Sequence, residues 1–272
     1  MKNKDSFEDN PDIPEIIYKY RDWNNCYHRN VIEKQELFLS SPKWFNDPYD
    51  CRINVAFHLL AEDPKLANDY FNQVVSRNFP NLSEKEHNLQ LQKLIDEGRF
   101  KDKGWLEHEN EITINNFHNN IGVISLTPHN NNILMWSHYS NSHRGFCVGF
   151  FTSKLFANPH YFGQGQKVNY PHEYPIILPT ESFFARSTKQ IFTKFKKWEY
   201  EDEYRLVKFN SADKIIKIPK DVFAEVILGY LISKEDEKCI IMRVRNYLPN
   251  VKILKVKANI HNYELTIEPI KE

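Results

Sequence analysis

Glycine is scarce in this chain: only 8 of the 272 residues are glycine. Loops that hold phosphate groups are usually glycine-rich, because the backbone must approach the ligand closely. Neither a P-loop nor a dinucleotide-binding fingerprint can be written anywhere in the sequence. The scarcity of glycine therefore argues against a kinase, a P-loop NTPase and a doubly wound dehydrogenase.

The charge balance gives no sign of a polyanionic partner. Lys and Arg total 36, as do Asp and Glu, so no global field attracts nucleic acid or an anionic membrane. The run 194–197 is the one candidate basic patch, and the alternative is a solvated helix end. The N-terminus lacks the apolar segment of a signal peptide, and no stretch approaches the roughly 20 apolar residues of a membrane span. We expect a cytoplasmic protein without a membrane partner.

The four cysteines, none of them in a Cys-x-x-Cys pair, are expected to be reduced thiols in a reducing compartment. Their spacing, and that of the histidines, matches no standard zinc site. We therefore predict that no metal is bound.

Short apolar and aromatic runs alternate with helical patterns along the chain. Strands are expected at 16–20, 37–40, 122–127, 146–150, 167–170, 204–209, 222–228, 251–257 and 264–270. Helices are expected at 29–35, 134–140, 180–197 and 235–247. We predict an α+β fold with a central, mostly antiparallel sheet. Residues 1–12 would be loose, and 13–272 would form a single domain.

Two helical stretches carry more specific expectations. The charged stretch from about 55 to 118 reads as a helical insertion beside the sheet, with Ser83 as a helix cap. In the helix predicted at 180–197, the buried face is expected to contain Phe183, Phe184, Ile191 and Phe195.

The segment 44–50 combines turn chemistry with acidic side chains. Pro48 fixes its own φ, and Asn46 and Asp47 can bond to nearby backbone N–H groups. The resulting tight turn would present Asp47 and Asp50 beside aromatic rings. The alternative is a plain turn with an aromatic anchor.

The segment 135–145 is dense in polar aromatic residues. On a helix, Trp136 and Tyr139 lie three positions apart and could form a shelf on which a flat ring stacks. His138 and His143 add polar groups, although their spacing matches no standard metal site. The alternative is that Trp136 and Tyr139 are core residues whose polar tips are satisfied.

The segment 198–207 places four carboxylates directly before an apolar strand. If the strand begins at Glu203, then Glu203 and Arg205 point to one face. A carboxylate at the mouth of a strand, with an arginine two residues on, is well placed to bind a polar ligand. The alternative is a solvated acidic turn with an ion pair. Glu203 should be better buried than Glu201, because it lies closer to the apolar run.

Together these segments resemble a bacterial family known as domain of unknown function 2971, which carries no assigned activity. The matching stretches are 18–20, 37–42, 45–48, 125–127, 135–139, 143–150, 198–206 and 226–229. The likeness extends from about residue 16 to 270. Its motifs are specific together and weak singly.

The chain is also distantly similar to ADP-ribosyltransferases of the kind that modify DNA. Both open with strand, short helix, strand and a proline turn. Both close with a strand that begins at a glutamate and leads to a proline and an Ile/Val-rich strand. The sequence departs from that pattern at Tyr18-Lys19-Tyr20, where many such enzymes have His or Arg.

This second resemblance implies an enzyme that uses NAD as a substrate. Glu203 would be the catalytic acid, stabilising positive charge as the nicotinamide–ribose bond breaks. Substrate binding would fall to Tyr20, Arg21, Asn46, Asp47, Ser125, Trp136, His138, Tyr139, His143 and Arg205. The acceptor would be a nucleic acid or a protein. The resemblance also suggests a toxin or phage-defence effector, with an antitoxin or a defence-system protein as its partner.

Two other functions fit the same residues. A metal-dependent nuclease would use Asp47, Asp50, Glu201 and Glu203, but the acid-x-Lys spacing expected beside them is missing. A sensor that binds a nucleotide without catalysis would use the same pocket, and Glu203 would then affect only affinity.

Overall fold

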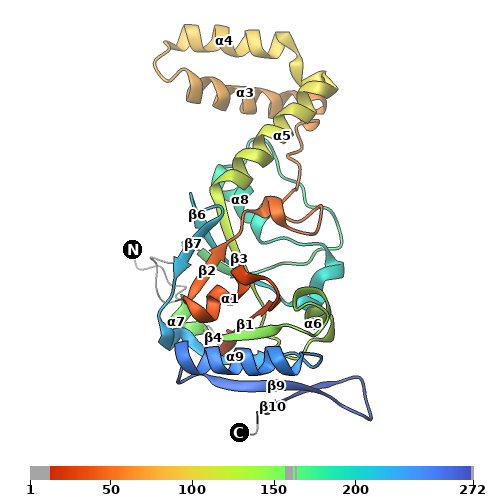
Figure 1. Cartoon of the computed structure of the whole chain (residues 1–272). Coiled ribbons are helices and arrows are strands. Elements are labelled where there is room, and N and C mark those ends of the chain that lie inside the picture. The colour runs from red at the N-terminus through yellow and green to blue at the C-terminus, as the bar shows by residue number, and fades with distance from the viewer. Residues whose placement is uncertain (1–12, 157–161, 163, 271–272) are drawn as a thin grey trace. The chain divides into compact units, whose positions relative to one another are not determined.

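A computed structural model describes residues 13–156, 162 and 164–270 (Figure 1). The chain divides into two compact units. The first unit comprises residues up to 41, 121–168 and 197 onward, and the second comprises 42–120 and 169–196. The chain therefore enters the second unit twice. The prediction of a single domain stays a prediction.

A five-stranded sheet forms the centre of the first unit. Its order is β1 (Ile16–Arg21), β4 (Phe146–Phe151), β8 (Phe223–Leu228), β9 (Lys252–Ala258) and β10 (Leu265–Pro269). All neighbouring pairs are antiparallel except β8 and β9, which are parallel and joined through α9 (Lys234–Tyr247). The prediction of an α+β fold with a mostly antiparallel central sheet is confirmed.

Two smaller sheets complete the first unit. One has the order β3 (Ile121–Leu126), β6 (Tyr204–Phe209) and β5 (Gln164–Lys167), and the other pairs β2 (Glu36–Leu39) with β7 (Lys214–Lys217). Tyr18 and Thr127 exchange backbone hydrogen bonds of 2.7 and 3.0 Å, so β1 lies beside the end of β3. This bridge brings the polar side chains of β1 close to those at the start of β6.

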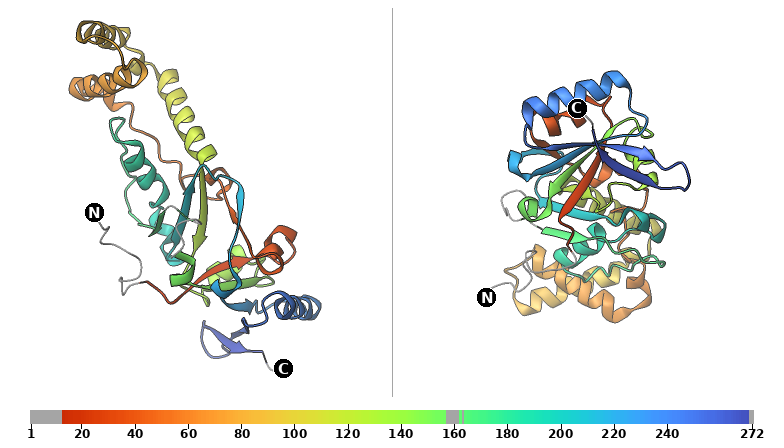
Figure 2. Two further views of the ribbon diagram at one scale, coloured as in Figure 1. Left: turned by 90° about the vertical axis from the view of Figure 1, so that its left-hand side faces the viewer. Right: turned by 90° about the horizontal axis from the view of Figure 1, so that it is seen from below.

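The inner strands β4 and β8 of the central sheet are buried because other elements pack on both faces of the sheet. β4 and β8 are buried along almost their whole length, as expected for continuous apolar runs in the middle of a covered sheet. On one face Ile240 and Val244 of α9 pack into the main core, and Figure 2 shows α9 lying along the sheet. On the other face a smaller cluster contains Tyr18, Tyr20 and Trp136.

Capping residues set where the helices of the first unit begin. α1 (Cys26–Glu33) begins after Asn25, whose side chain accepts from the Tyr27 N–H, so it starts earlier than the predicted residue 29. α6 (Ile133–Tyr139) begins after Asn132 and lies within one residue of its prediction. The short helices of this unit are α7 (Thr152–Phe156), η5 (Lys220–Val222) and η4 (Lys196–Glu201), which begins at the boundary of the units.

The second unit is mainly helical. Its elements are η2 (Pro42–Trp44), α2 (Leu59–Glu62), α3 (Pro64–Asn78), α4 (Glu84–Glu97), η3 (Arg99–Lys101), α5 (Lys103–Asn120) and α8 (Phe183–Ile191). α3 and α4 lie side by side (Figure 1), and Ser83 caps α4 through a capping box, as predicted for that serine. Phe57, Phe71, Phe100 and Ile177 contribute to its core. The predicted helical stretch at about 55–118 is confirmed as α2 to α5.

The helix predicted at 180–197 is shorter in the structure, and of the residues expected on its buried face only Ile191 is buried. Ser182 caps α8, which spans only Phe183–Ile191, and its buried positions are Ser187, Gln190 and Ile191. Phe183 and Phe184 are exposed, as is Phe195 beyond the helix. The buried face is set instead by Gln190, whose amide bonds to the backbone N–H and C=O of Ile53.

Two strand predictions also differ from the structure. The strand expected at 167–170 lies earlier, at β5, and Val168 onward forms only single backbone contacts. β7 was missed, because its two isoleucines are flanked by lysines and largely exposed beside β2.

Candidate functional site

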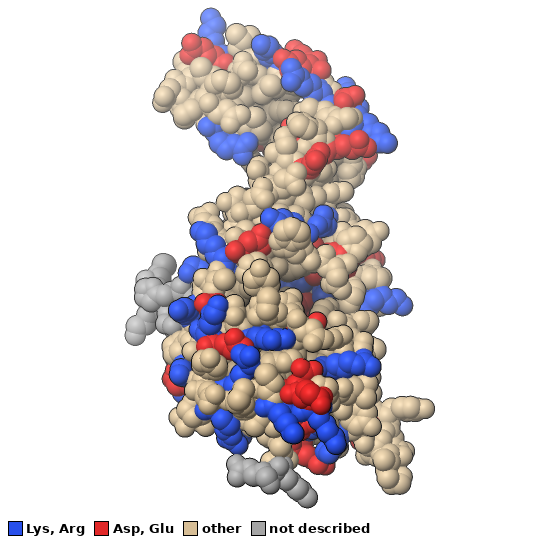
Figure 3. Space-filling model, viewed as in Figure 1, with Lys and Arg blue, Asp and Glu red and all other residues tan. Residues whose placement is uncertain are grey.

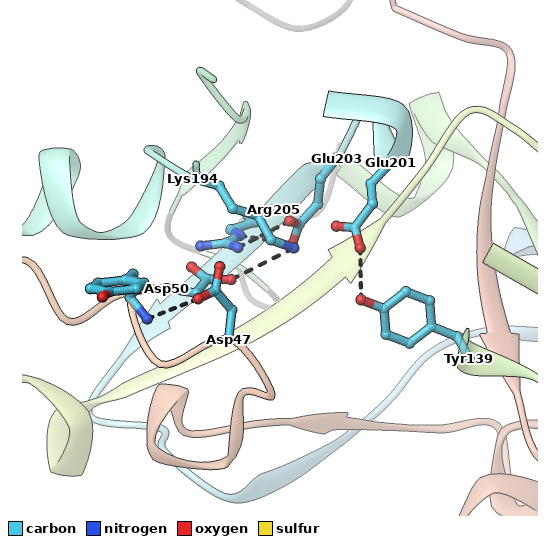
Figure 4. Close-up of polar contacts among 8 residues, drawn as sticks. Asp47, Asp50, Tyr139, Lys194, Glu201, Glu203 and Arg205 are labelled. Carbon is cyan, nitrogen blue, oxygen red and sulfur yellow. Dashed lines mark hydrogen bonds and ion pairs between the residues drawn. The ribbon is translucent and has the colours of Figure 1, made fainter. Parts of the chain in front are cut away.

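Glu203 and Arg205 form a buried ion pair at the start of β6. Arg205 Nε lies 2.8 Å from Glu203 Oε1, and Nη2 lies 3.0 Å from Oε2 (Figure 4). The two side chains share one face of the strand, as their spacing of two predicts. Planar guanidinium and carboxylate groups matched in this way hold each other in a fixed orientation.

Glu201 belongs to the same cluster and receives a hydrogen bond from α6. Tyr139 Oη donates to Glu201 Oε1 at 2.7 Å (Figure 4). Burial, and then the negative charge of Glu201, raise the pKa of the Tyr139 phenol, so it stays protonated. Glu201 and Glu203 are each only 3% exposed. The expectation that Glu203 is the better buried of the two was therefore wrong.

The turn between these glutamates has its own polar partners. Asp202 adopts a left-handed backbone with φ of 45°. Its carboxylate lies 2.5 Å from Lys167 Nζ and 3.4 Å from His129 Nε2. These contacts hold the Asp202 side chain in the turn that carries Glu201 and Glu203. They are separate from the contacts that Glu201 makes with Tyr139 and Glu203 with Arg205.

Strand β1 places two cations beside this cluster. Lys19 Nζ donates to the backbone oxygen of Ser125 at 2.7 Å, and Ser125 lies opposite Arg205 in the β3–β6 register. Burial, and then the nearby charge of Arg21, lower the pKa of Lys19 well below its usual value, while Glu203 opposes that change. Burial lowers the pKa of Arg21 to about 10. Two cations thus lie within electrostatic reach of each other, and one of them within reach of Glu203.

The prediction from sequence missed Lys19. The sequence pattern that could have revealed it is a lysine between two tyrosines in a short strand. Because side chains alternate along a strand, this lysine lies on the face opposite to the tyrosines. Tyr18 and Tyr20 indeed pack in the smaller core cluster, on the other face from Lys19.

Trp136 was expected to form part of a shelf for a flat ring, and Tyr20 to bind substrate; in the structure both pack in the smaller core cluster. Their ring centroids are 5.0 Å apart in an edge-to-face arrangement. Trp136 is fully buried and its Nε1 donates to the Asn130 oxygen, and Tyr20 Oη donates to the His129 oxygen. The alternative interpretation, a core aromatic with a satisfied polar tip, therefore describes Trp136. Its ring offers no exposed face to a ligand in this structure.

The two histidines of the same motif have different surroundings. His138 is exposed at the end of α6. His143 is half-buried, stacks on Trp136 with a centroid distance of 6.4 Å, and lies 3.0 Å from Ser137 Oγ through Nε2. Burial, and then Arg144, lower the pKa of His143. His143 thus supports the packing of Trp136.

Asn46 and Asp47 lie in the second unit. Asn46 is exposed, whereas Asp47 is buried and its Oδ1 accepts from the Tyr49 N–H at 2.9 Å, which confirms the predicted turn. Asp50, in the same turn, pairs with Lys194 at 3.7 Å (Figure 4), and both side chains are buried. That this segment joins the Glu203 cluster stays a prediction.

Three further features concern the described part of the chain as a whole. Basic and acidic side chains are mixed over the face shown in Figure 3. Among residues 13–156, 162 and 164–270, no three His, Cys, Asp or Glu side chains are grouped so that they could hold a metal ion. In the same ranges, no helix has the length and apolar character needed to cross a membrane.

One family model matches part of the chain. Residues 135–206 match the family described as "Protein of unknown function (DUF2971)". The matched range contains Tyr139, Glu201, Glu203 and Arg205, so it covers the centre of the cluster in the first unit. The resemblance inferred from the sequence is confirmed over that range. Searches of curated proteins and of solved structures found no significant match.

Proposed function

We propose that this protein transfers ADP-ribose from NAD to an acceptor and that Glu203 is its catalytic carboxylate. The observation that carries the proposal is the buried Glu203–Arg205 pair at the mouth of β6. The pair is flanked by Lys19 from β1, by Ser125 from β3 and by the Tyr139–Glu201 hydrogen bond. A polar cluster of this kind suits a polar, charged substrate.

The proposed chemistry breaks one bond and forms another. The nicotinamide–ribose bond breaks, and nicotinamide leaves with the bonding electron pair. Positive charge then develops at the ribose carbon, where a fixed carboxylate stabilises it electrostatically. The acceptor forms the new bond to that carbon and loses a proton, which Glu203 would accept.

The neighbours of Glu203 have supporting roles in this proposal. Arg205 positions the carboxylate through its two hydrogen bonds. Lys19 and Arg21 would contact the pyrophosphate of NAD, because cations on a strand beside the site favour phosphate oxygens. An anion bound beside Lys19 would raise its lowered pKa, because a nearby negative charge favours the ammonium form.

The acceptor and the biological role stay predictions. The resemblance to DNA-modifying enzymes suggests a nucleic acid or a protein as acceptor, and a toxin or phage-defence effector as the role. Cytoplasmic location likewise rests on the sequence alone.

Incubation with NAD⁺ tests the proposal directly. Purified protein should bind NAD⁺ in calorimetry and release nicotinamide, followed by liquid chromatography. Binding without release, even with cell extract as a source of acceptor, would favour the sensor function. Absence of NAD⁺ binding would exclude the transferase.

A further inference from the structure

We infer that the second unit carries a separate pocket that binds a nucleobase, independently of the proposed transferase. The pocket has a volume of about 330 Å³, at the lower end of the range for small-molecule sites. Its walls come from the turn after Asp47, from residues 171–175 and from residues 193–195. All of these belong to the second unit.

Local backbone contacts build the pocket. The Asp47 turn fixes the position of Tyr49, through the hydrogen bond from the Tyr49 N–H to Asp47 Oδ1. The backbone of Asn169 bonds to Phe192 and Lys194, which aligns the proline-bounded segment 171–175 with residues 193–195. The walls are therefore held in place by the buried Asp47 carboxylate and by backbone hydrogen bonds.

Three exposed aromatic side chains line the pocket. Tyr49 is 63% exposed, Tyr174 is 53% exposed and Phe195 is 46% exposed. Within the described residues none of the three rings makes a ring–ring contact, although such contacts are frequent elsewhere in the chain. Aromatic faces that are gathered in one pocket and still open to solvent suit a planar ring, which gains stacking energy there.

The charges in the wall favour a neutral ring over a phosphate. Lys194 is paired with Asp50, and Glu173 adds a further negative charge. The pocket thus has no excess of positive charge to attract an anion. A phosphate attached to the base would have to lie outside.

Polar groups in the wall favour a nucleobase over an aromatic amino acid side chain. Thr193, His172 and Glu173 bring hydrogen-bond donors and acceptors to a pocket whose larger faces are apolar. A nucleobase presents several donors and acceptors along its edge, whereas a phenylalanine ring presents none. The ligand is either a free nucleoside or a base within a single-stranded nucleic acid. Comparing the affinities for nucleosides and for oligonucleotides distinguishes the two.

Binding of uncharged nucleosides to the full chain is the test. Adenosine, guanosine, cytidine and uridine are titrated by ligand-observed NMR, and single-stranded DNA and RNA oligonucleotides by fluorescence anisotropy. We expect saturable binding of at least one nucleoside. Phe195→Ala and Tyr49→Ala should each weaken it about ten-fold, as when a stacking ring is removed, whereas Tyr49→Phe should retain it.

Matched variants control for the alternatives. Tyr263→Ala removes a fully exposed tyrosine of the first unit and should leave binding unchanged. Glu203→Gln should also bind nucleosides normally, so loss of NAD turnover and loss of nucleobase binding can be distinguished. Circular dichroism confirms that each variant is folded.

Each outcome decides the inference. Tighter binding of an oligonucleotide than of its nucleosides identifies a base within a strand, and nucleoside binding alone identifies a free ligand. No saturable binding of any probe, or unchanged binding by the Phe195→Ala protein, would overturn the inference. Equal binding of phenylalanine amide would replace the nucleobase with an aromatic amino acid.

Discussion

Arg205 Nε and Nη2 each bond to a different oxygen of Glu203, although only Tyr204 separates the two residues along β6. This contact is local in sequence and buried in the fold, on the strand that pairs with β3. Because both charges are desolvated, each depends on the other for its stability in the core. The pair therefore couples the folding of this region to the orientation of the carboxylate.

Glu203→Gln should lower the rate of nicotinamide release by roughly 10²–10³-fold, because it removes one electrostatic contribution to the transition state. The affinity for NAD⁺ should fall much less. Glu201→Gln should have little effect, since glutamine still offers an oxygen to Tyr139 Oη. Release rates and calorimetric affinities of the two variants check this prediction.

A control is needed because the Glu203→Gln protein leaves a buried arginine without its anion. Arg205→Lys keeps the charge but cannot form two parallel hydrogen bonds. It should lower the free energy of unfolding by about 1.5–3 kcal/mol and reduce turnover by misplacing Glu203. If the Glu203→Gln protein is folded and releases nicotinamide at the normal rate, Glu203 is not the catalytic acid.

Gly145→Ala should destabilise the first unit. An added Cβ would lie 2.1 Å from the Arg21 oxygen, between β1 and the loop that follows α6. Backbone must move to relieve such a contact, which costs about 1–3 kcal/mol or more. Urea unfolding, followed by the fluorescence of buried Trp23 and Trp136, measures the loss.

Gly104→Ala is the matched control for that substitution. Gly104 lies within α5, where alanine is favoured over glycine by up to about 1 kcal/mol. Its added Cβ meets only the Asp102 side-chain oxygen, at 3.2 Å. Equal destabilisation by both substitutions would contradict the close approach of β1 to Gly145.

The stability of the folded chain should decrease as the pH is lowered, over a range set partly by His28. Burial, and then Arg21 and Lys19, lower the pKa of His28 to about 4, and its Nδ1 accepts from the Asp22 N–H. The unfolded chain takes up this proton near pH 6.5. Between about pH 6.5 and 4 the unfolded state therefore binds more protons, and lowering the pH weakens folding. Below about pH 4 the histidine is protonated in both states, so the stability gained from its neutral form is fully lost and His28 causes no further change.

His28→Asn tests that window, because asparagine retains an acceptor near Nδ1 but does not titrate. The variant should lose less stability than the native chain between pH 6.5 and 4, measured by urea midpoints at each pH. Identical pH profiles for the two proteins would show that His28 is not held neutral by its surroundings.

Limited proteolysis tests the single-domain prediction. Cleavage is expected first before Ile13, in a segment that lies outside the described residues. It should then occur in the exposed loop between α3 and α4, around residues 79–83, or near 98–104. Mass spectrometry of early fragments locates the cuts. Two stable fragments that divide between Asp50 and Ser125 would contradict a single domain.

Local patterns predicted much of the fold of the first unit. The apolar runs at β1, β4, β6 and β8 have the strand propensity and length that the structure realises. Glu203 and Arg205 were placed on one face by the period of two alone, and the structure agrees. Sequence predicted these features because each depends on neighbours along the chain.

Features that depend on distant partners were not predictable in this way. The buried face of α8 contains Gln190 because its side-chain amide bonds to the backbone of Ile53. The spacing of phenylalanines in the sequence gives no indication of this contact. Trp136 is buried because Tyr20, from a strand over a hundred residues earlier, packs against it. Lys19 belongs to the candidate site only because β1 meets the end of β3.

The sheet order described above has a consequence for synthesis on the ribosome. β1 is made first, yet its partner β4 begins at Phe146, and β8 begins only at Phe223. At about 5–20 residues per second, roughly 6–25 s pass between translation of β1 and of its partner β4. The second unit likewise cannot be completed until residues 169–196 have been translated. A nascent chain therefore exposes the unpaired edge of β1 until β4 has been translated, and a chaperone would have to shield it for that time.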